Sequence, residues 1–101
     1  MTEKELRKHI KPFLRFAIEV LKNDLKRGET DGLCLIANDY DRSIKEHNGT
    51  YEISNYLEER LIFARPKDSG TLAYWWIYTK NVDAIQKRID FCRLQLKIVK
   101  P

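Results

Sequence analysis

Apolar side chains recur every three or four residues along most of the chain, a spacing typical of amphipathic α-helices. In residues 3–27 the apolar positions are Leu6, Ile10, Phe13, Leu14, Ala17, Ile18, Leu21 and Leu25. Thr2 stands where an N-cap is expected, and Gly28 follows the last turn. Pro12 lacks a backbone N–H, so either the helix kinks there, or a short helix ends near Ile10 and a longer one begins at Pro12.

A second helix is expected after a turn at residues 28–32, with Asp31 as a candidate N-cap. Its apolar positions are Leu33, Ile36, Ala37, Tyr40 and Ile44. A buried strand over residues 33–37 is the alternative, because a short apolar run has no decisive period. The spacing continues beyond that run, which favours the helix. The Asn48-Gly49 dipeptide then predicts a turn.

Two further helices follow. One begins near Tyr51, capped by Thr50 or Ser54, and ends before Pro66. Its buried face consists of Ile53, Tyr56, Leu57, Leu61 and Ala64. The last helix follows Asn81 as N-cap, with apolar positions at Val82, Ile85, Ile89, Cys92, Leu96 and Val99, and with Phe91, Leu94 and Ile98 widening the stripe. So wide a stripe indicates burial on two sides, which predicts a homodimer or larger oligomer.

Residues 71–79 lack helical spacing and are rich in β-prone side chains. An extended segment is expected there, and its backbone must pair with another part of the chain, with a second subunit or with water. The predicted fold is mainly α: a small bundle of four or five helices with one short extended aromatic segment. Because the helices differ in length and Pro12 and Pro66 interrupt them, orthogonal packing is favoured over a regular up-down bundle.

The length of 101 residues and the hydrophobic content of 43% predict one globular domain over residues 1–101. No apolar run approaches the ~20 residues that span a bilayer, and Met1 begins a charged stretch, unlike a signal peptide. The two cysteines, Cys34 and Cys92, are too few for a disulfide scaffold and are expected in the core. We therefore expect a cytoplasmic protein that does not enter a membrane.

The charge is unevenly distributed. Residues 1–27 carry eight basic and four acidic side chains, residues 28–59 carry two and eight, and residues 60–101 carry nine and three. Basic terminal helices packed beside an acidic middle are one interpretation. The other is an anion-binding groove between the terminal helices, lined by Arg15, Lys22, Lys80, Lys87, Arg88 and Arg93.

Spacings that indicate catalysis or metal binding are nearly absent. His9 and His47 fall in different elements, without a metal-ligand spacing to either cysteine, and are interpreted as solvated surface residues. Adjacent or alternate acids such as Asp39 and Asp41 do not share a helix face. We therefore expect no enzyme activity, no metal and no cofactor.

The aromatic segment carries the most informative side chains: Tyr74, Trp75, Trp76 and Tyr78. Such rings stack on bases or cations, so with Lys80 they could form a platform beside a phosphate. The alternative is that all of them belong to the core or to a subunit interface. Arg42 and Arg88 are further candidate phosphate ligands, and Arg88 is expected to flank the core stripe with its guanidinium outward.

Two local motifs, Gly32-Leu33-Cys34 and Tyr74-Trp75-Trp76, together resemble small accessory proteins of bacteriophages, in which a "GLC" helix and a "YWW" segment precede an Arg-bearing helix. The corresponding Arg here is in Lys87-Arg88, whereas the proline and glycine that often follow the aromatics are replaced by Ile77 and Asn81. The resemblance implies a phage origin and an anti-defence type of function in the host cytoplasm, since such proteins bind and block a host factor and some sequester nucleotide immune signals.

The first functional hypothesis is therefore a non-enzymatic inhibitor that binds a host protein or a nucleotide-like molecule, with candidate ligand-binding residues Arg42, Tyr74, Trp75, Trp76, Tyr78, Lys80 and Arg88. The alternative is a nucleic-acid-binding module that uses the basic last helix. Acidic residues of the third helix would repel a phosphate backbone, which disfavours that alternative.

Overall fold

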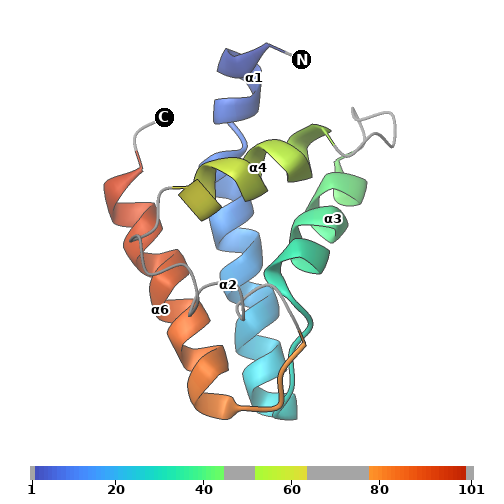
Figure 1. Cartoon of the computed structure of the whole chain (residues 1–101), viewed down its shortest axis with the longest axis vertical. Helices are drawn as coiled ribbons and strands as arrows, with labels where there is room; N and C mark the ends of the chain where they lie inside the picture. The colour runs from blue at the N-terminus through green and yellow to red at the C-terminus, as the bar shows by residue number, and fades with distance from the viewer. Residues whose placement is uncertain (1, 45–51, 64–77, 100–101) are drawn as a thin grey trace.

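The computed structural model describes residues 2–44, 52–63 and 78–99 (Figure 1). Within these ranges it contains five α-helices: α1 (Glu3–Arg7), α2 (Ile10–Arg27), α3 (Leu33–Ser43), α4 (Glu52–Phe63) and α6 (Val82–Ile98). The described residues form no strand and only one isolated antiparallel bridge, between Thr30 and Thr79. The mainly α fold predicted from the spacing is confirmed, and residues 33–37 are helical, as the longer pattern indicated.

Local hydrogen bonds define the helix ends as predicted at three positions. Thr2 Oγ1 accepts from the backbone N–H of Glu5 at 3.2 Å, and Asn81 Oδ1 accepts from the N–H groups of Asp83 and Ala84. Gly28 ends α2 in the left-handed conformation, with a φ of 82° that favours glycine.

The other helix boundaries differ in part from expectation. The first break falls at residues 8–9, and Pro12 occupies the first turn of α2, where its missing N–H costs no intrahelical bond. Gly32, not Asp31, is the N-cap of α3, without a side-chain cap. Ser54 lies inside α4 rather than at its start.

The core forms where α2 meets α6 and α3. Helix α2 packs most extensively on α6, it also contacts α3, and α4 packs on α3. Figure 1 shows α2 and α6 running in opposite directions along the long axis, with α4 lying across α2. The expected orthogonal packing therefore describes α4, whereas α2 and α6 lie lengthwise.

Burial follows the predicted stripes closely on α2 and less closely on α6. Phe13, Leu14 and Leu21 are buried on α2, and Ile85, Ile89 and Cys92 are buried on α6. The side chain of Cys34 lies outside the described residues. Of the residues that widen the last stripe, Phe91 packs against the core, whereas Leu94 and Ile98 are more than half exposed. Val82, the first residue of the main stripe, is also more than half exposed.

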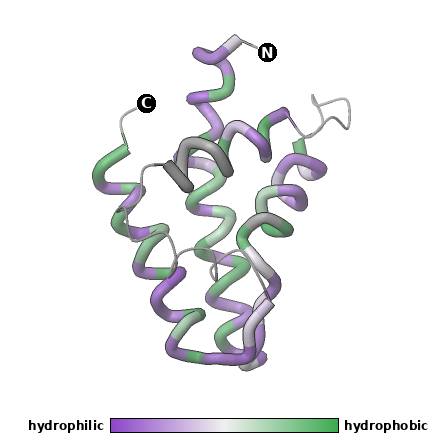
Figure 2. Tube along the Cα trace, viewed as in Figure 1, coloured by the Kyte–Doolittle hydropathy of each residue, from purple (hydrophilic) through white to green (hydrophobic). Residues whose placement is uncertain are grey.

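Apolar and polar stretches follow one another along α2 and α6 (Figure 2). Among the described residues no helix is both long and apolar enough to cross a membrane. The polar residues are not all outside, because Asp24, Thr30, Asp41, Ser54, Arg88 and Gln95 are buried.

Candidate functional site

The loop between α2 and α3 pairs with the segment that leads into α6. The backbone N–H groups of Thr30 and Thr79 each donate to the carbonyl oxygen of the other residue, both at 2.9 Å. Thr79, at the end of the segment predicted to be extended, therefore finds its backbone partner within the same chain. Residues 71–77 of that prediction lie outside the described residues. The bridge places Tyr78 and Lys80, the neighbours of Thr79, beside the junction of α2 and α3.

Asp24 anchors this loop from the last turn of α2. Its buried carboxylate accepts a 2.6 Å hydrogen bond from Thr30 Oγ1 and a 2.8 Å hydrogen bond from Arg27 Nη2. The backbone carbonyl of Asp24 also accepts from the N–H groups of Gly28 and Glu29, so the chain reverses around this residue. Because a buried carboxylate needs such partners, Asp24 and Thr30 stabilise each other's position.

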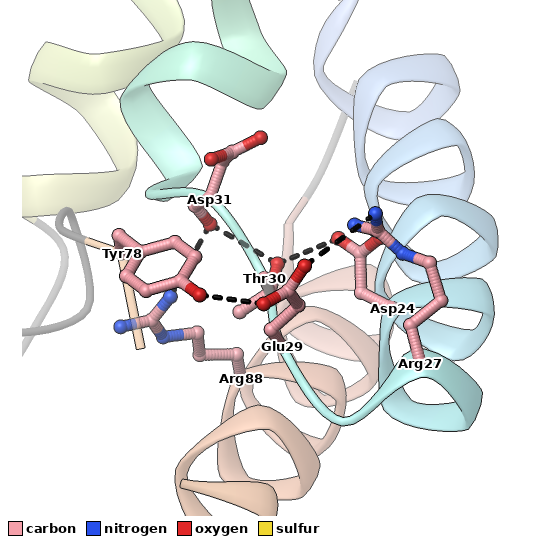
Figure 3. Close-up of polar contacts among 7 residues, drawn as sticks. All are labelled: Asp24, Arg27, Glu29, Thr30, Asp31, Tyr78 and Arg88. Atoms are coloured by element: carbon pink, nitrogen blue, oxygen red, sulfur yellow. Dashed lines mark hydrogen bonds and ion pairs between the residues drawn. The ribbon is translucent and has the colours of Figure 1, made fainter. Parts of the chain in front are cut away.

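Tyr78 joins the same network from the other side of the bridge (Figure 3). Its hydroxyl donates a 2.6 Å hydrogen bond to Glu29 Oε2, and Glu29 Oε1 lies 4.0 Å from Arg27 Nη1. The hydrogen bond to Glu29 raises the pKa of Tyr78, because the carboxylate stabilises the protonated phenol. The side chain is nevertheless 50% exposed, so an oriented aromatic ring stands at the surface.

Arg88 reaches this loop from α6, and here the expectation of an outward guanidinium is wrong. The side chain is 1% exposed, and Nη1 donates to the backbone carbonyl of Asp31 at 3.4 Å. Burial lowers the pKa of Arg88, since a low-polarity environment disfavours the charged form. In this position Arg88 connects α6 to the start of α3 (Figure 3) and is not available to a phosphate from solvent.

The predicted site residues are only partly brought together. Tyr78, Lys80 and Arg88 lie around the Thr30–Thr79 bridge, with Lys80 exposed. Arg42 is in the last turn of α3, about nine residues or ~13 Å along the helix from its start, where it pairs with Asp39. Tyr74, Trp75 and Trp76 lie outside the described residues.

The anion-binding groove does not form as expected. Helices α2 and α6 pack directly on each other, so the space between them is filled by core side chains. Arg15, Lys22, Lys87 and Arg93 are exposed, whereas Arg88 is inside. The interpretation that basic and acidic elements pack with solvated faces fits the described residues better.

Sequence reasoning missed Asp24 and Thr30, although the pattern held a signal for some of the buried polar residues. Asp24 follows Leu21 by three positions on the apolar face of α2. Arg88 and Gln95 follow Ile85 and Cys92 by the same three positions on α6, and both are buried. A charged or amide side chain at a stripe position therefore marked a buried polar group rather than the edge of the stripe.

Two smaller polar contacts join other helices. His9 Nδ1 lies 3.0 Å from the Tyr40 hydroxyl, so His9 is partly buried rather than a solvated surface histidine. Burial raises the pKa of Tyr40. Ser54 Oγ donates to Asp41 Oδ2 at 3.4 Å and thereby connects α4 to α3.

Within the described ranges no group of three or more His, Cys, Asp or Glu side chains is arranged to hold a metal ion. Comparison with known proteins finds no match to this chain among protein-family models, curated proteins or solved structures. Its function is therefore inferred from its own residues and contacts.

Proposed function

We propose that the chain is a binding protein of the phage accessory type, without enzyme activity, that blocks or sequesters a bacterial host protein. The observation that carries the proposal is the half-exposed Tyr78, whose hydroxyl is hydrogen-bonded to Glu29. Tyr is enriched among the residues that dominate binding free energy at protein interfaces. A ring that is already oriented also loses little conformational entropy when a partner covers it.

The surroundings of Tyr78 favour a protein over a nucleotide. Glu29 and Asp31 place carboxyl groups in the same loop, and a phosphate beside them would be repelled. Arg88, the expected phosphate ligand, is buried, and Arg42 is at the opposite end of α3. Two exposed cations remain among the described residues around Tyr78: Lys80, and Arg27, which is already paired with Asp24 and Glu29.

The nucleic-acid alternative has less support from the described part of α6. Its exposed positions carry three cations, Lys87, Arg93 and Lys97, but Asp83 and Asp90 are interspersed with them. A nucleic-acid footprint needs cations clustered on one face without intervening acids.

The proposed working form is a homodimer in the host cytoplasm. Support for the second copy comes from the exposed apolar residues of α6, Leu94 and Ile98, which the chain's own core does not cover. The proposal that the protein acts in a bacterial host cell is supported by the resemblance of the "GLC" and "YWW" motifs to phage proteins.

The proposal is tested by affinity capture from bacterial lysate with three immobilised baits: wild type, Tyr78→Ala and Leu35→Ala. Leu35 is a matched control, since it is exposed to the same degree as Tyr78 but lies on α3. A protein retained by wild type and Leu35→Ala but lost with Tyr78→Ala is the expected result. With the purified partner, Tyr78→Ala should weaken binding by about 2 kcal/mol or more, which is about thirtyfold in Kd.

Two outcomes would overturn the choice of partner. A rise in melting temperature with cyclic or linear nucleotides, lost in Lys80→Ala, would favour the nucleotide-sequestering alternative. An electrophoretic shift of nucleic acid that survives moderate salt, where weak electrostatic binding is lost, would favour the nucleic-acid alternative.

A further inference from the structure

The outward side of α6 carries two large aliphatic side chains one turn apart. Leu94 is 54% exposed and Ile98 is 57% exposed. Leu94 follows the fully buried Ile85 by nine residues, which places it about half a turn around the helix from the core-facing side. The chain's own core therefore cannot cover Leu94, and another surface must do so if it is to be buried.

Opposite charges flank Leu94 along the same side. Asp90 precedes Leu94 by four residues, and Lys97 follows it by three, so each lies about one turn away. Both are exposed, and within the described residues neither belongs to an ion pair, although Asp90 accepts a 3.0 Å hydrogen bond from Gln86.

Asp90 and Lys97 cannot pair with each other inside one helix. They are separated by seven residues, or ~10 Å along the axis. By contrast, exposed pairs such as Arg7–Glu3 and Arg42–Asp39 are three or four residues apart and lie within single helices. The charges that flank Leu94 therefore suit a partner whose charges run in the opposite order.

A second copy of α6 is such a partner when it runs antiparallel. A two-fold axis close to Leu94 brings the Leu94 side chains of the two copies together. It also sets Asp90 of each copy opposite Lys97 of the other, because these two residues lie at nearly equal distances on either side of Leu94. The surface is thus self-complementary in both apolar character and charge, as a two-fold interface requires.

We propose that two copies of the chain associate through the outward sides of their α6 helices, antiparallel about a two-fold axis near Leu94. Leu94 and Ile98 are buried in the interface, and two Asp90–Lys97 pairs define the register. This inference rests on the homodimer in the proposed function and specifies its surface. It is tested on the purified chain alone, so its failure leaves the host-partner proposal standing, and loss of host binding leaves the dimer untouched.

Sedimentation velocity over a micromolar concentration series is the first test. Wild type is expected to reach twice the chain mass of 12.0 kDa, and Leu94→Glu is expected to stay monomeric. Leu35→Glu is the matched control, because Leu35 is comparably exposed on α3, and it should still dimerise. Circular dichroism confirms that each variant is helical. A monomeric wild type, a dimeric Leu94→Glu, or an equal loss in Leu35→Glu would overturn the proposed surface.

Charge exchange and cross-linking test the register. Asp90→Lys should raise the dimer Kd on the order of tenfold, since it places cations opposite each other, and adding Lys97→Asp should restore most of the affinity. In a Cys34→Ser background, Leu94→Cys should form a disulfide-linked dimer on mild oxidation, because the two positions meet at the axis. Leu35→Cys in the same background should not. If the double exchange fails to recover dimerisation, or if Leu35→Cys cross-links as readily as Leu94→Cys, the antiparallel register is wrong.

Discussion

The hydroxyl of Thr30 donates a 2.6 Å hydrogen bond to Oδ2 of Asp24, and both side chains are buried. The same Thr30 exchanges two backbone hydrogen bonds with Thr79. The contact therefore connects the end of α2 to the segment that presents Tyr78 and begins α6. Damage to this contact should affect both the fold and the proposed binding surface.

Replacing Thr30 by Val should lower the free energy of unfolding by about 1.5–3 kcal/mol, because a buried hydrogen bond to a charged acceptor is lost at constant side-chain volume. Urea denaturation measures the change. Thr30→Ser keeps the hydroxyl and should recover most of the loss. A Thr30→Val variant as stable as wild type would show that the hydroxyl contributes nothing to folding.

Arg88→Ala should destabilise the protein by about 2–5 kcal/mol, since it removes a long, fully buried side chain. Arg88→Met, which keeps the aliphatic length, should cost less. Arg93→Ala is the control, because this exposed arginine of the same helix should change stability by less than about 0.5 kcal/mol. Equal effects at the two positions would contradict a structural role for Arg88.

Gly28→Ala should cost about 1–2 kcal/mol, because a Cβ disfavours the left-handed conformation of this residue. Apart from the local backbone and the two neighbouring residues, no atom lies within 4 Å of the position that a Cβ would occupy, so the cost is conformational rather than steric. Gly28→Asn should be milder, since Asn adopts this conformation more readily. Thermal unfolding of the two variants measures their order of stability. A Gly28→Ala variant more stable than Gly28→Asn would contradict the prediction.

Stability should fall as the pH rises above about 9, in part because of Cys92. Burial raises the pKa of this thiol from 9.0 to about 12. The folded chain therefore holds the proton longer than the unfolded chain, so the stabilisation is complete below pH 9 and is lost as the pH approaches 12. Tyr40 and Tyr78, whose pKa values are also raised, act in the same direction.

Urea unfolding at increasing pH, in a Cys34→Ser background, measures this loss. The fall in stability should be shallower after a further Cys92→Ala substitution, which removes the titrating thiol. Identical pH slopes with and without Cys92 would contradict the prediction. The Cys92→Ala variant is compared by slope, so the constant cost of the small cavity cancels.

Local features of the sequence determined the helices and three of their ends. The three-to-four spacing of apolar residues predicted α2, α3 and α6, because a helix places such residues on one side wherever it packs. Thr2, Gly28 and Asn81 were predicted as caps, because each acts on backbone groups within a few residues of itself. The sequence likewise indicated that Leu94 and Ile98 widen the apolar side of the last helix beyond what one core can cover.

Only the tertiary structure decided which polar residues are buried and which candidates meet. Arg88 is inside because α6 packs lengthwise on α2 and brings the guanidinium to Asp31, which is 57 residues away in sequence. The partner of Tyr78 is 49 residues away, and Arg42 is separated from both by the length of α3. Residue spacing within one helix cannot determine such contacts, because they depend on how separate helices align. They also depend on which groups of other elements replace water as hydrogen-bond partners of each buried polar residue.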